Sequence, residues 1–219
     1  QGTPKGPADF AGPLWRELFK HACNEAHRLG LQINMNNDAG WCGSGGPWIT
    51  PELSMQKVVW SETTVVGPKR FEGTLPQPQT VSGFYRDITV VAMPAPTDKM
   101  RINDIANKSG SYPKLGGASA TPQPAKIPVV PATAITPQNQ LLEITAKMDL
   151  SGKLIWDVPA GKWLILRMGH TSTGQVNHPA PAAGTGLECD KFSKQAAAIH
   201  FNALMGRLIA ENKAVAGRD

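Results

Sequence analysis

The sequence lacks a long apolar run, a cluster of basic residues and any cysteine spacing typical of a metal or redox centre. No hydrophobic stretch approaches the ~20 residues of a membrane helix. The 22 basic residues exceed the 17 acidic ones only mildly and are spread along the chain, which argues little for nucleic-acid binding. Cys23, Cys42 and Cys189 lie far apart and are odd in number, so we expect free, mostly buried thiols.

An initiator methionine and a signal-peptide pattern are also missing from the first residues. Gln1–Gly12 is rich in glycine and proline, as if the chain began within a loop. We therefore expect an internal piece of a longer protein. Because 41% of the 219 residues are hydrophobic, a packed core is feasible and wholesale disorder is not expected.

The most informative stretch runs from Leu31 to Glu52. Residues 31–35 alternate apolar and polar side chains, which predicts a short strand. The residues after this strand include amides, a carboxylate, glycines and two tryptophans, and they follow no regular period. Such residues at a strand end are typical of a binding rim, since strand ends position functional loops. The polar and aromatic members are Asn36, Asn37, Asp38, Trp41, Ser44, Trp48 and Glu52.

Sugars suit this composition. One face of a pyranose is apolar and stacks on indole, while its hydroxyls pair with amides and carboxylates. The alternative is a surface loop whose tryptophans cover a core, because Asn and Gly form turns in any protein. Composition leaves both interpretations open.

Two amphipathic helices and several short strands are expected along the chain. One helix spans Leu14–Leu29 with Gly30 as its stop, and the other spans roughly Ser193–Asn212 with Ser193 as N-cap. Leu187–Cys189 reads as a very short strand before the second helix. Proline-rich residues 94–137 read as extended loop. The strand candidates between the helices are Met55–Val66, Tyr85–Met93, Leu141–Met148, Leu154–Asp157 and Lys162–Gly169.

This order, helix–strand, then β-block, then strand–helix, favours an all-β module inserted after a strand of an α/β domain. Strands without helices between them suggest an antiparallel sandwich or jelly roll.

Two further polar clusters follow predicted strands. One is the stretch His170–His178, and the other is Glu188, Asp190 and Lys191. Glu188 and Asp190 fall on the same side of a strand, so with Lys191 they could bind sugar hydroxyls or a hard cation such as Ca²⁺. The alternative is a helix N-terminus that Asp190 stabilises through the helix dipole. Both interpretations remain open.

Glycoside hydrolysis needs two carboxyl groups, and the candidates are Asp38, Glu52, Glu188 and Asp190. A serine hydrolase is a weaker alternative. Ser44 lacks the first glycine of G-x-S-x-G, and its histidine would have to be His170 or His178. The glycines after Cys42 could also form a phosphate nest, but no P-loop lysine follows them.

Four stretches together resemble the α-L-rhamnosidases of glycoside hydrolase family 106. They are WRELFKHACNEAHRLGLQINMNNDAGWCGSGGPWITPELSMQKVVWSE, GFYRDITVVAMP, VPAGKWLILRMGHTSTGQVNHPAP and GLECDKFSKQAAAIHF. They occur in the family's order and span nearly the whole chain. The combination is more specific than any single motif.

The resemblance implies a fold of α/β plus all-β class: a partial (β/α)₈ barrel with an inserted antiparallel, jelly-roll-like β-sandwich. Residues 1–54 and 177–219 would be barrel segments, and residues 55–176 the sandwich. The family's catalytic carboxylates are expected beyond Asp219, so this piece alone should not turn over substrate.

For function, the resemblance implies calcium-dependent, inverting hydrolysis of terminal α-L-rhamnosides by the full-length protein. The substrate would be a rhamnose-containing oligosaccharide, polysaccharide or glycoside. The remainder of the polypeptide would be the protein partner, with no nucleic acid or membrane involved. A periplasmic or secreted location is expected from the family. The residues expected to bind substrate are Asn36, Asn37, Trp41, Ser44, Trp48, Glu52, His178, Glu188, Asp190 and Lys191.

A different class of function is a non-catalytic carbohydrate-binding β-sandwich. Trp156 and Trp163 would then form its stacking platform. Core packing explains both tryptophans better, and the helix–strand flanks have no place in a lone module.

Overall fold

The computed structural model describes residues 6–37, 39, 43–96, 131 and 134–217. The chain divides into two compact units. The helical unit comprises Gln1–Gln56, Thr80–Tyr85 and Thr171–Asp219, and the sheet unit comprises Lys57–Gln79 and Arg86–His170. The domain boundaries expected from the resemblance, at 54/55 and 176/177, stay a prediction. None of the helices in the described part of the chain is both long and apolar enough to cross a membrane.

Helix α1 (Pro13–Leu29) ends where the sequence predicts and begins one residue before the predicted start at Leu14. Pro13 occupies the first turn, where its missing N–H costs no hydrogen bond. Gly30 adopts the left-handed conformation (φ 69°), and its N–H bonds the carbonyls of Ala26 and His27. The helix buries none of its residues fully among those described, and Leu14 and Leu18 remain exposed.

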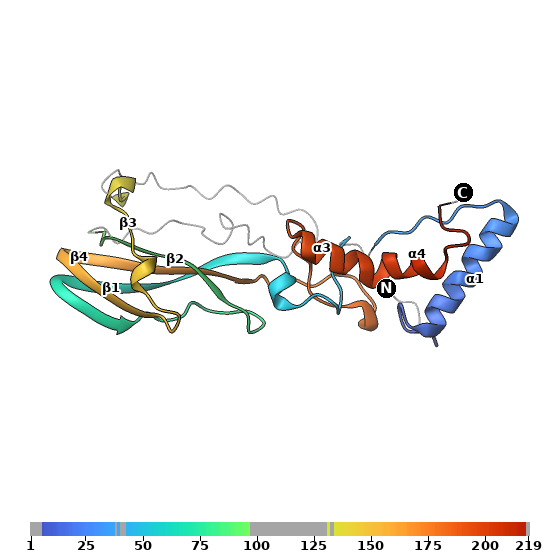
Figure 1. The fold of residues 1–219 in the computed structure, drawn as a ribbon, viewed down its shortest axis with the longest axis horizontal. Helices are drawn as coiled ribbons and strands as arrows, with labels where there is room; N and C mark the ends of the chain where they lie inside the picture. The colour runs from blue at the N-terminus through green and yellow to red at the C-terminus, as the bar shows by residue number, and fades with distance from the viewer. Residues whose placement is uncertain (1–5, 38, 40–42, 97–130, 132–133, 218–219) are drawn as a thin grey trace. The chain divides into compact units, whose positions relative to one another are not determined.

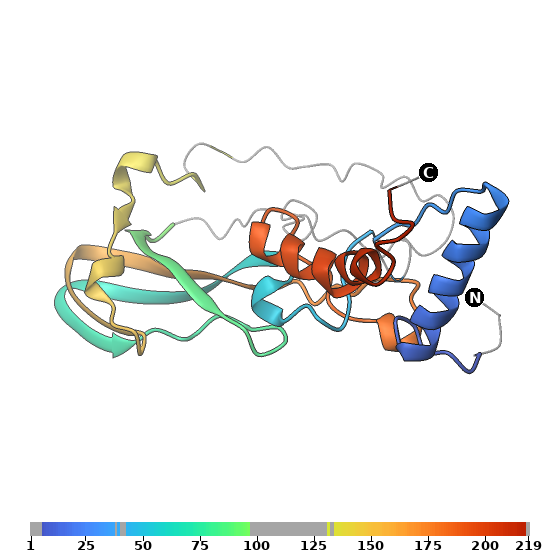
Figure 2. The same cartoon turned by 45° about the vertical axis from the view of Figure 1, so that its right-hand side comes forward.

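The second predicted helix is confirmed as one run with an irregular middle (Figure 2). It consists of α3 (Lys194–Phe201), the π-helical turn η6 (Asn202–Gly206) and α4 (Arg207–Glu211). Ser193 is its N-cap, because the Ser193 side chain accepts the Ala196 N–H at 3.2 Å. The helix buries Ala196, Leu204 and Leu208 at the spacing of one helical face.

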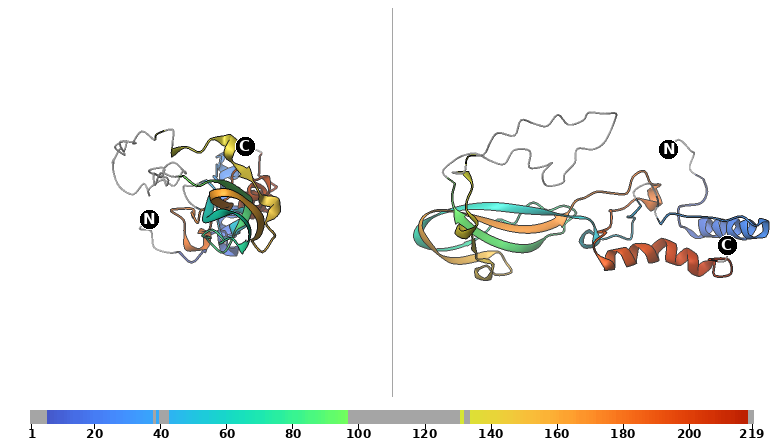
Figure 3. Two further views of the ribbon diagram at one scale, coloured as in Figure 1. Left: turned by 90° about the vertical axis from the view of Figure 1, so that its left-hand side faces the viewer. Right: turned by 90° about the horizontal axis from the view of Figure 1, so that it is seen from above.

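The sheet unit is built on a four-stranded sheet in the order β1-β4-β2-β3 (Figures 1 and 3). The strands are β1 (Gln56–Thr74), β2 (Arg86–Pro94), β3 (Leu142–Glu143) and β4 (Lys153–Ser172). β2 pairs antiparallel with both β4 and β3. Short 3₁₀ turns also occur in the chain: η1 (Pro51–Leu53), η3 (Gln138–Gln140), η4 (Thr145–Lys147) and η5 (Ala182–Gly184).

The core of the sheet unit is apolar. Leu154, Ile165, Val90 and Ala92 lose essentially all of their accessible surface. Trp156 is only 5% exposed and packs edge to face against Trp163, with ring centroids 5.6 Å apart. A buried indole offers no stacking face to a sugar, which argues against the tryptophan platform of a binding module.

Two predicted strand ends are wrong because glycine and proline continue the strands there. β1 passes through Gly67-Pro68, and β4 joins two predicted strands through Pro159 and Gly161. A Cβ on Gly67 would lie 2.0 Å from the Pro159 carbonyl oxygen, so glycine permits close approach of the two backbones. Proline is tolerated because β1 is at the sheet edge, where one side of the strand needs no N–H donor.

The predicted fold class, a partial (β/α)₈ barrel with an inserted β-sandwich, is wrong. The described residues form one open sheet in place of a sandwich, because β4 joins two predicted strands and β1 extends beyond the end of the predicted one. Leu31–Met35 is not a strand, and Leu31 and Ile33 are exposed. Leu187 and Cys189 make only isolated antiparallel bridges. The β2–β3 and β2–β4 pairs and the isolated bridges among the described residues are antiparallel, whereas a barrel needs parallel pairs.

Two other predictions change or fall outside the described residues. The strand expected at Leu141–Met148 shortens to β3 followed by η4. Most of the loop expected at residues 94–137 lies outside the described part of the chain.

Candidate functional site

Within the helical unit, a short segment around Glu188 joins two stretches that are distant in sequence. The Gly46 N–H donates to the Leu187 carbonyl at 3.2 Å, and the Met55 N–H donates to the Glu188 carbonyl at 2.9 Å. On the other side, the Glu188 N–H donates to the Gln175 carbonyl at 2.9 Å. The loop before β1 and the loop after β4 are therefore both hydrogen-bonded to the segment around Glu188.

Small residues make this close packing possible. Gly45 has φ +100°, and a Cβ there would lie 2.8 Å from the Leu187 carbonyl oxygen. Asn177, which is 1% exposed, fixes the backbone just before Leu187 through its side-chain amide. Its Nδ2 donates to the Gly184 carbonyl, and its Oδ1 accepts the Gly186 N–H, both at 2.8 Å. A fully satisfied buried amide of this kind fixes the path of the backbone.

Ser44, Glu188 and Lys191 form the charged centre of this arrangement, here called the Glu188 cluster. The Ser44 hydroxyl donates to Glu188 Oε2 at 2.5 Å, and Lys191 Nζ lies 3.2 Å from the same oxygen. The Glu188 side chain is 8% exposed, whereas that of Lys191 is 55% exposed. Charge-assisted hydrogen bonds of this type hold a buried carboxylate in one orientation. An oriented carboxylate accepts hydrogen bonds, which is the chemistry that sugar hydroxyls need.

Trp48 packs against residues on either side of Glu188 in the chain and is held by a separate set of contacts. It packs with Leu187 and Ile199 around a small core of Ile49, Cys189 and Ala196. Its indole Nε1–H donates to His200 Nδ1 at 3.1 Å. Trp48 is half-buried, so the ring is both anchored and partly accessible.

The other predicted site residues are less closely associated. The Asp190 carboxylate accepts the Phe192 N–H at 2.9 Å in the turn before α3, as the helix N-terminus interpretation expects. Glu52 is exposed in η1, and Asn36 and His178 are also exposed. Asn37 contacts α3 and η6. Trp41, as well as the candidate carboxylate Asp38, lies outside the described residues.

Two buried polar residues that organise the site were not identified from the sequence. They are His200, which is 4% exposed, and Asn177. His200 stands four residues after Ala196 and four before Leu204, on the apolar stripe of the second helix. A histidine at such a position needs polar partners, which is the signal that could have revealed it. Asn177 lies within the predicted His170–His178 cluster but carries no distinguishing pattern.

The calcium expectation finds no support in this part of the protein. No group of three or more His, Cys, Asp or Glu side chains in the described ranges could hold a metal ion. The Glu188 cluster supplies one carboxylate that is already paired with a lysine, which is a poor start for a site needing several oxygen ligands. No chemical step is therefore assigned to calcium here, and the metal stays a prediction for the full-length protein.

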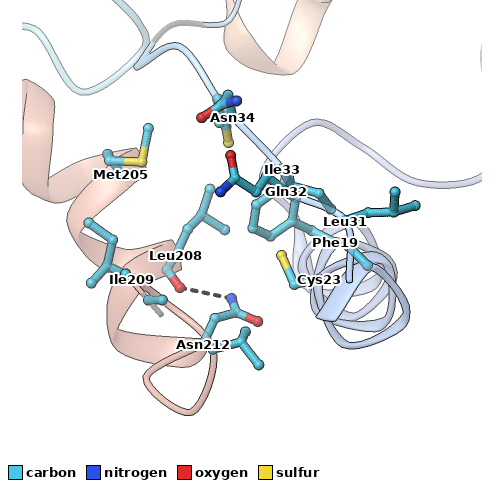
Figure 4. A pocket seen from close by; sticks show the side chains of 15 residues that line it. Phe19, Cys23, Leu31, Gln32, Ile33, Asn34, Met205, Leu208, Ile209 and Asn212 are labelled. Carbon is cyan, nitrogen blue, oxygen red and sulfur yellow. Dashed lines mark hydrogen bonds between the residues drawn. The ribbon is translucent and has the colours of Figure 1, made fainter. Parts of the chain in front are cut away.

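A pocket of about 260 Å³ with a mixed polar and apolar lining lies elsewhere in the helical unit (Figure 4). Phe19, Leu31, Leu208 and Ile209 contribute to its lining. Cys23 also lines it, and burial raises the pKa of that thiol, which lowers its thiolate fraction. None of the predicted site residues lines this pocket, so we do not assign it to the sugar site.

Comparisons with known proteins give the family. The family model of glycoside hydrolase family 106, described as alpha-L-rhamnosidase, matches residues 3–103 and 96–219. A curated relative from Formosa agariphila, named "Putative beta-glucuronidase", is 43% identical over 200 residues, or 91% of this chain. This chain spans only 17% of that relative's length.

A similar solved structure is the rhamnosidase from Novosphingobium sp. PP1Y. It matches 95% of this chain with a TM-score of 0.71 and 20% sequence identity, and the match covers 32% of that chain. At this identity the likeness concerns the fold alone. Because the family model covers almost the whole sequence, the chain belongs to glycoside hydrolase family 106, the α-L-rhamnosidase family.

Proposed function

We propose that this chain supplies part of the substrate subsite of a glycoside hydrolase that removes terminal α-L-rhamnose. The observation that carries the proposal is the Glu188 cluster, which joins Ser44 to a carboxylate 144 residues away. Both partners lie in stretches that resemble the family. In the full-length protein we place the catalytic acid and base outside this chain, so the chain alone is expected to be inactive.

The site residues have distinct roles in this proposal. Glu188 accepts hydrogen bonds from sugar hydroxyls, and Ser44 and Lys191 hold its carboxylate in place. Trp48 offers the exposed part of its indole to the apolar face of the sugar. These interactions orient the ring so that water attacks the anomeric carbon opposite the leaving group. This is the inverting course.

The charge of the cluster favours a neutral sugar over a uronic acid. Lys191 is paired with Glu188, so the pair presents no net positive charge to a ligand. A sugar carboxylate placed beside Glu188 would meet a buried group of the same sign, and like charges repel most strongly where solvent is excluded. Rhamnose carries no charge and avoids this cost.

A second candidate is a β-glucuronidase, the name given to the Formosa agariphila relative at 43% identity. In that case Lys191, whose side chain is more than half exposed, would turn from Glu188 to the glucuronate carboxylate. The two candidates therefore differ in what Lys191 does, which makes them separable by experiment.

The test uses the complete protein that contains this chain, with aryl α-L-rhamnoside and aryl β-D-glucuronide assayed in parallel. We expect hydrolysis of the rhamnoside with initial release of the inverted anomer, observed by proton NMR. Lys191→Met should leave the KM for rhamnoside within about threefold of wild type, because Lys191 does not touch the sugar in this proposal and the Ser44 hydroxyl still orients the Glu188 carboxylate. Activity on the glucuronide alone, lost in Lys191→Met, would overturn the proposal in favour of the second candidate.

Parallel assays with and without a chelator address the calcium expectation for the full-length protein. A periplasmic or secreted location also stays a prediction.

A further inference from the structure

His200 connects two of the predicted site residues through its two ring nitrogens. Nδ1 accepts the indole N–H of Trp48 at 3.1 Å, and Nε2 lies 2.6 Å from the backbone carbonyl oxygen of Asn37. Trp48 and Asn37 are 152 and 163 residues away from His200 in the sequence. The imidazole is buried and tilted against the Trp48 ring, with centroids 5.9 Å apart.

These two contacts define the protonation of the imidazole. An indole N–H only donates, so Nδ1 must be unprotonated to accept it. A carbonyl oxygen only accepts, so the hydrogen must sit on Nε2 to bond Asn37. The neutral Nε2–H tautomer satisfies both partners, whereas the other neutral tautomer satisfies neither.

The helix that carries His200 holds Asn37 at a second point. The Met205 N–H donates to Asn37 Oδ1 at 3.3 Å. Met205 belongs to the π-helical turn η6, where the backbone departs from the regular α-helical bonding pattern. Asn37 is therefore hydrogen-bonded at two points: His200 bonds its backbone carbonyl, and Met205 of η6 bonds its side chain. These two bonds make Asn37 an anchor of the loop, and its role in sugar binding stays a prediction.

We propose that His200, as its Nε2–H tautomer, is a positioning residue that holds Trp48 and the Asn37 segment in the sugar subsite. The inference rests on the proposed function, because Trp48 is taken to face the sugar. His200 does not touch the sugar. It sets the plane of the indole through one nitrogen and the path of the preceding loop through the other.

Simple core filling accounts less well for a histidine here. The neighbours of His200 on its helical face are Ala196 and Leu204, both buried and apolar. An apolar side chain would fill the same space without the cost of burying two ring nitrogens. The free-energy cost of burying the imidazole is offset only if both ring nitrogens are hydrogen-bonded. Those two bonds connect Trp48 and Asn37 to α3.

Matched substitutions in the complete protein separate the two bonds. His200→Asn keeps an acceptor near the position of Nδ1 but has no group to reach Asn37. His200→Gln keeps a donor near the position of Nε2 but places no acceptor at the position of Nδ1, so the bond from Trp48 is lost. His200→Leu removes both bonds while retaining an apolar side chain, and Trp48→Phe removes the indole N–H from the other side.

Hydrogen–deuterium exchange of the peptide spanning residues 31–37 reports the loop, and the KM for aryl α-L-rhamnoside reports the indole. We expect His200→Leu to raise KM about tenfold with little change in kcat, the size expected for one lost buried hydrogen bond. His200→Asn should recover most of the KM but not slow exchange, and His200→Gln should do the reverse. Combined with Trp48→Phe, His200→Leu should add little further to KM.

Additive effects of His200→Leu and Trp48→Phe on KM, or a loss of thermal stability without a change in KM, would overturn the inference. If the complete protein does not hydrolyse rhamnosides, the proposed function fails by itself. The exchange experiment still decides the positioning role in that case, because equal exchange in His200→Gln and His200→Asn would refute it.

Discussion

The sheet unit and the helical unit bury opposite kinds of side chain. The buried cluster of the sheet unit is wholly apolar, and Arg167 is the one buried charged residue found there among those described. The corresponding cluster of the helical unit contains just Ile49, Cys189 and Ala196 as fully buried members. The polar residues buried in the helical unit are Ser44, Ser54, Thr171, Ser172, Asn177, Glu188, His200 and Asn212.

This difference separates scaffold from site. Apolar burial stabilises a fold without demanding exact partners, whereas each buried polar group must be bonded or it costs about 1–3 kcal/mol. Arg167 meets that requirement inside the sheet unit through a bidentate pair with Asp87 and a bond to the Leu75 carbonyl. In the helical unit two of the buried polar residues, Ser44 and Glu188, are predicted site residues. His200 bonds two more, Trp48 and Asn37. This share of the buried polar contacts is expected of a binding site.

The largest expected effect is on the stability of the sheet unit. Leu154→Ala should reduce the free energy of unfolding by about 2–5 kcal/mol, because a fully buried leucine leaves a cavity when truncated. Ile155→Ala is the matched control, since the adjacent side chain points the other way and is 38% exposed. Denaturant unfolding measures both. Equal losses would show that the sheet has no distinct buried face.

An intermediate effect is expected in the helical unit, on activity more than on stability. Glu188→Gln should lower kcat/KM for rhamnoside about thirtyfold, because a charge-assisted acceptor for sugar hydroxyls contributes about 2 kcal/mol. Glu17→Gln is the matched control, because that carboxylate is exposed on α1 and lies outside the predicted site. Steady-state kinetics and thermal melts on the complete protein distinguish the outcomes. A large fall in Tm with unchanged kinetics would assign Glu188 to the scaffold.

The smallest effect is expected for the ion pair between Lys153 and Glu72, 2.6 Å long and exposed on the sheet unit. The hydrogen bond between Glu72 and Lys153 lowers the pKa of Glu72 and raises the pKa of Lys153. The contribution of the pair is therefore full between the unfolded pKa of Glu72 and that of Lys153. It is lost as pH falls to the lower, folded pKa of Glu72 or rises to the higher, folded pKa of Lys153.

Solvent screens a pair of this kind, so Lys153→Met should leave the Tm unchanged within error at neutral pH. A drop comparable to that of Leu154→Ala would mean that surface charge, rather than apolar burial, holds the sheet unit together.

Local signals in the sequence predicted the helices well. Gly30 ends α1 and Ser193 caps α3 because both effects depend on a few neighbouring residues.

The strands were less predictable. Gly67-Pro68 reads as a turn but lies inside β1, since what matters there is the approach of Pro159 from the other strand. The barrel failed for the same reason, because residues 31–35 have the pattern of a strand without a strand partner in the described residues.

The site was partly predictable. The carboxylate at Glu188 and the hydroxyl at Ser44 were both selected by residue type, but nothing local shows that they meet. The sequence also pairs Glu188 with Asp190 on one side of a strand, whereas the structure buries the first and uses the second to fix the turn before α3. His200 was missed because helical periodicity alone gives an isolated histidine no partner.

One pair of contacts bears on how this architecture could change over evolution. The Ser54 hydroxyl donates to the Ser172 hydroxyl at 2.7 Å, and the Thr173 N–H donates to the Met55 carbonyl at 2.8 Å. These bonds join the start of β1 to the end of β4, the two positions where the chain enters and leaves the sheet. An ancestral gene could have gained, enlarged or exchanged that excursion without disturbing the spacing of Ser44 and Glu188, since adjoining ends make a natural graft point.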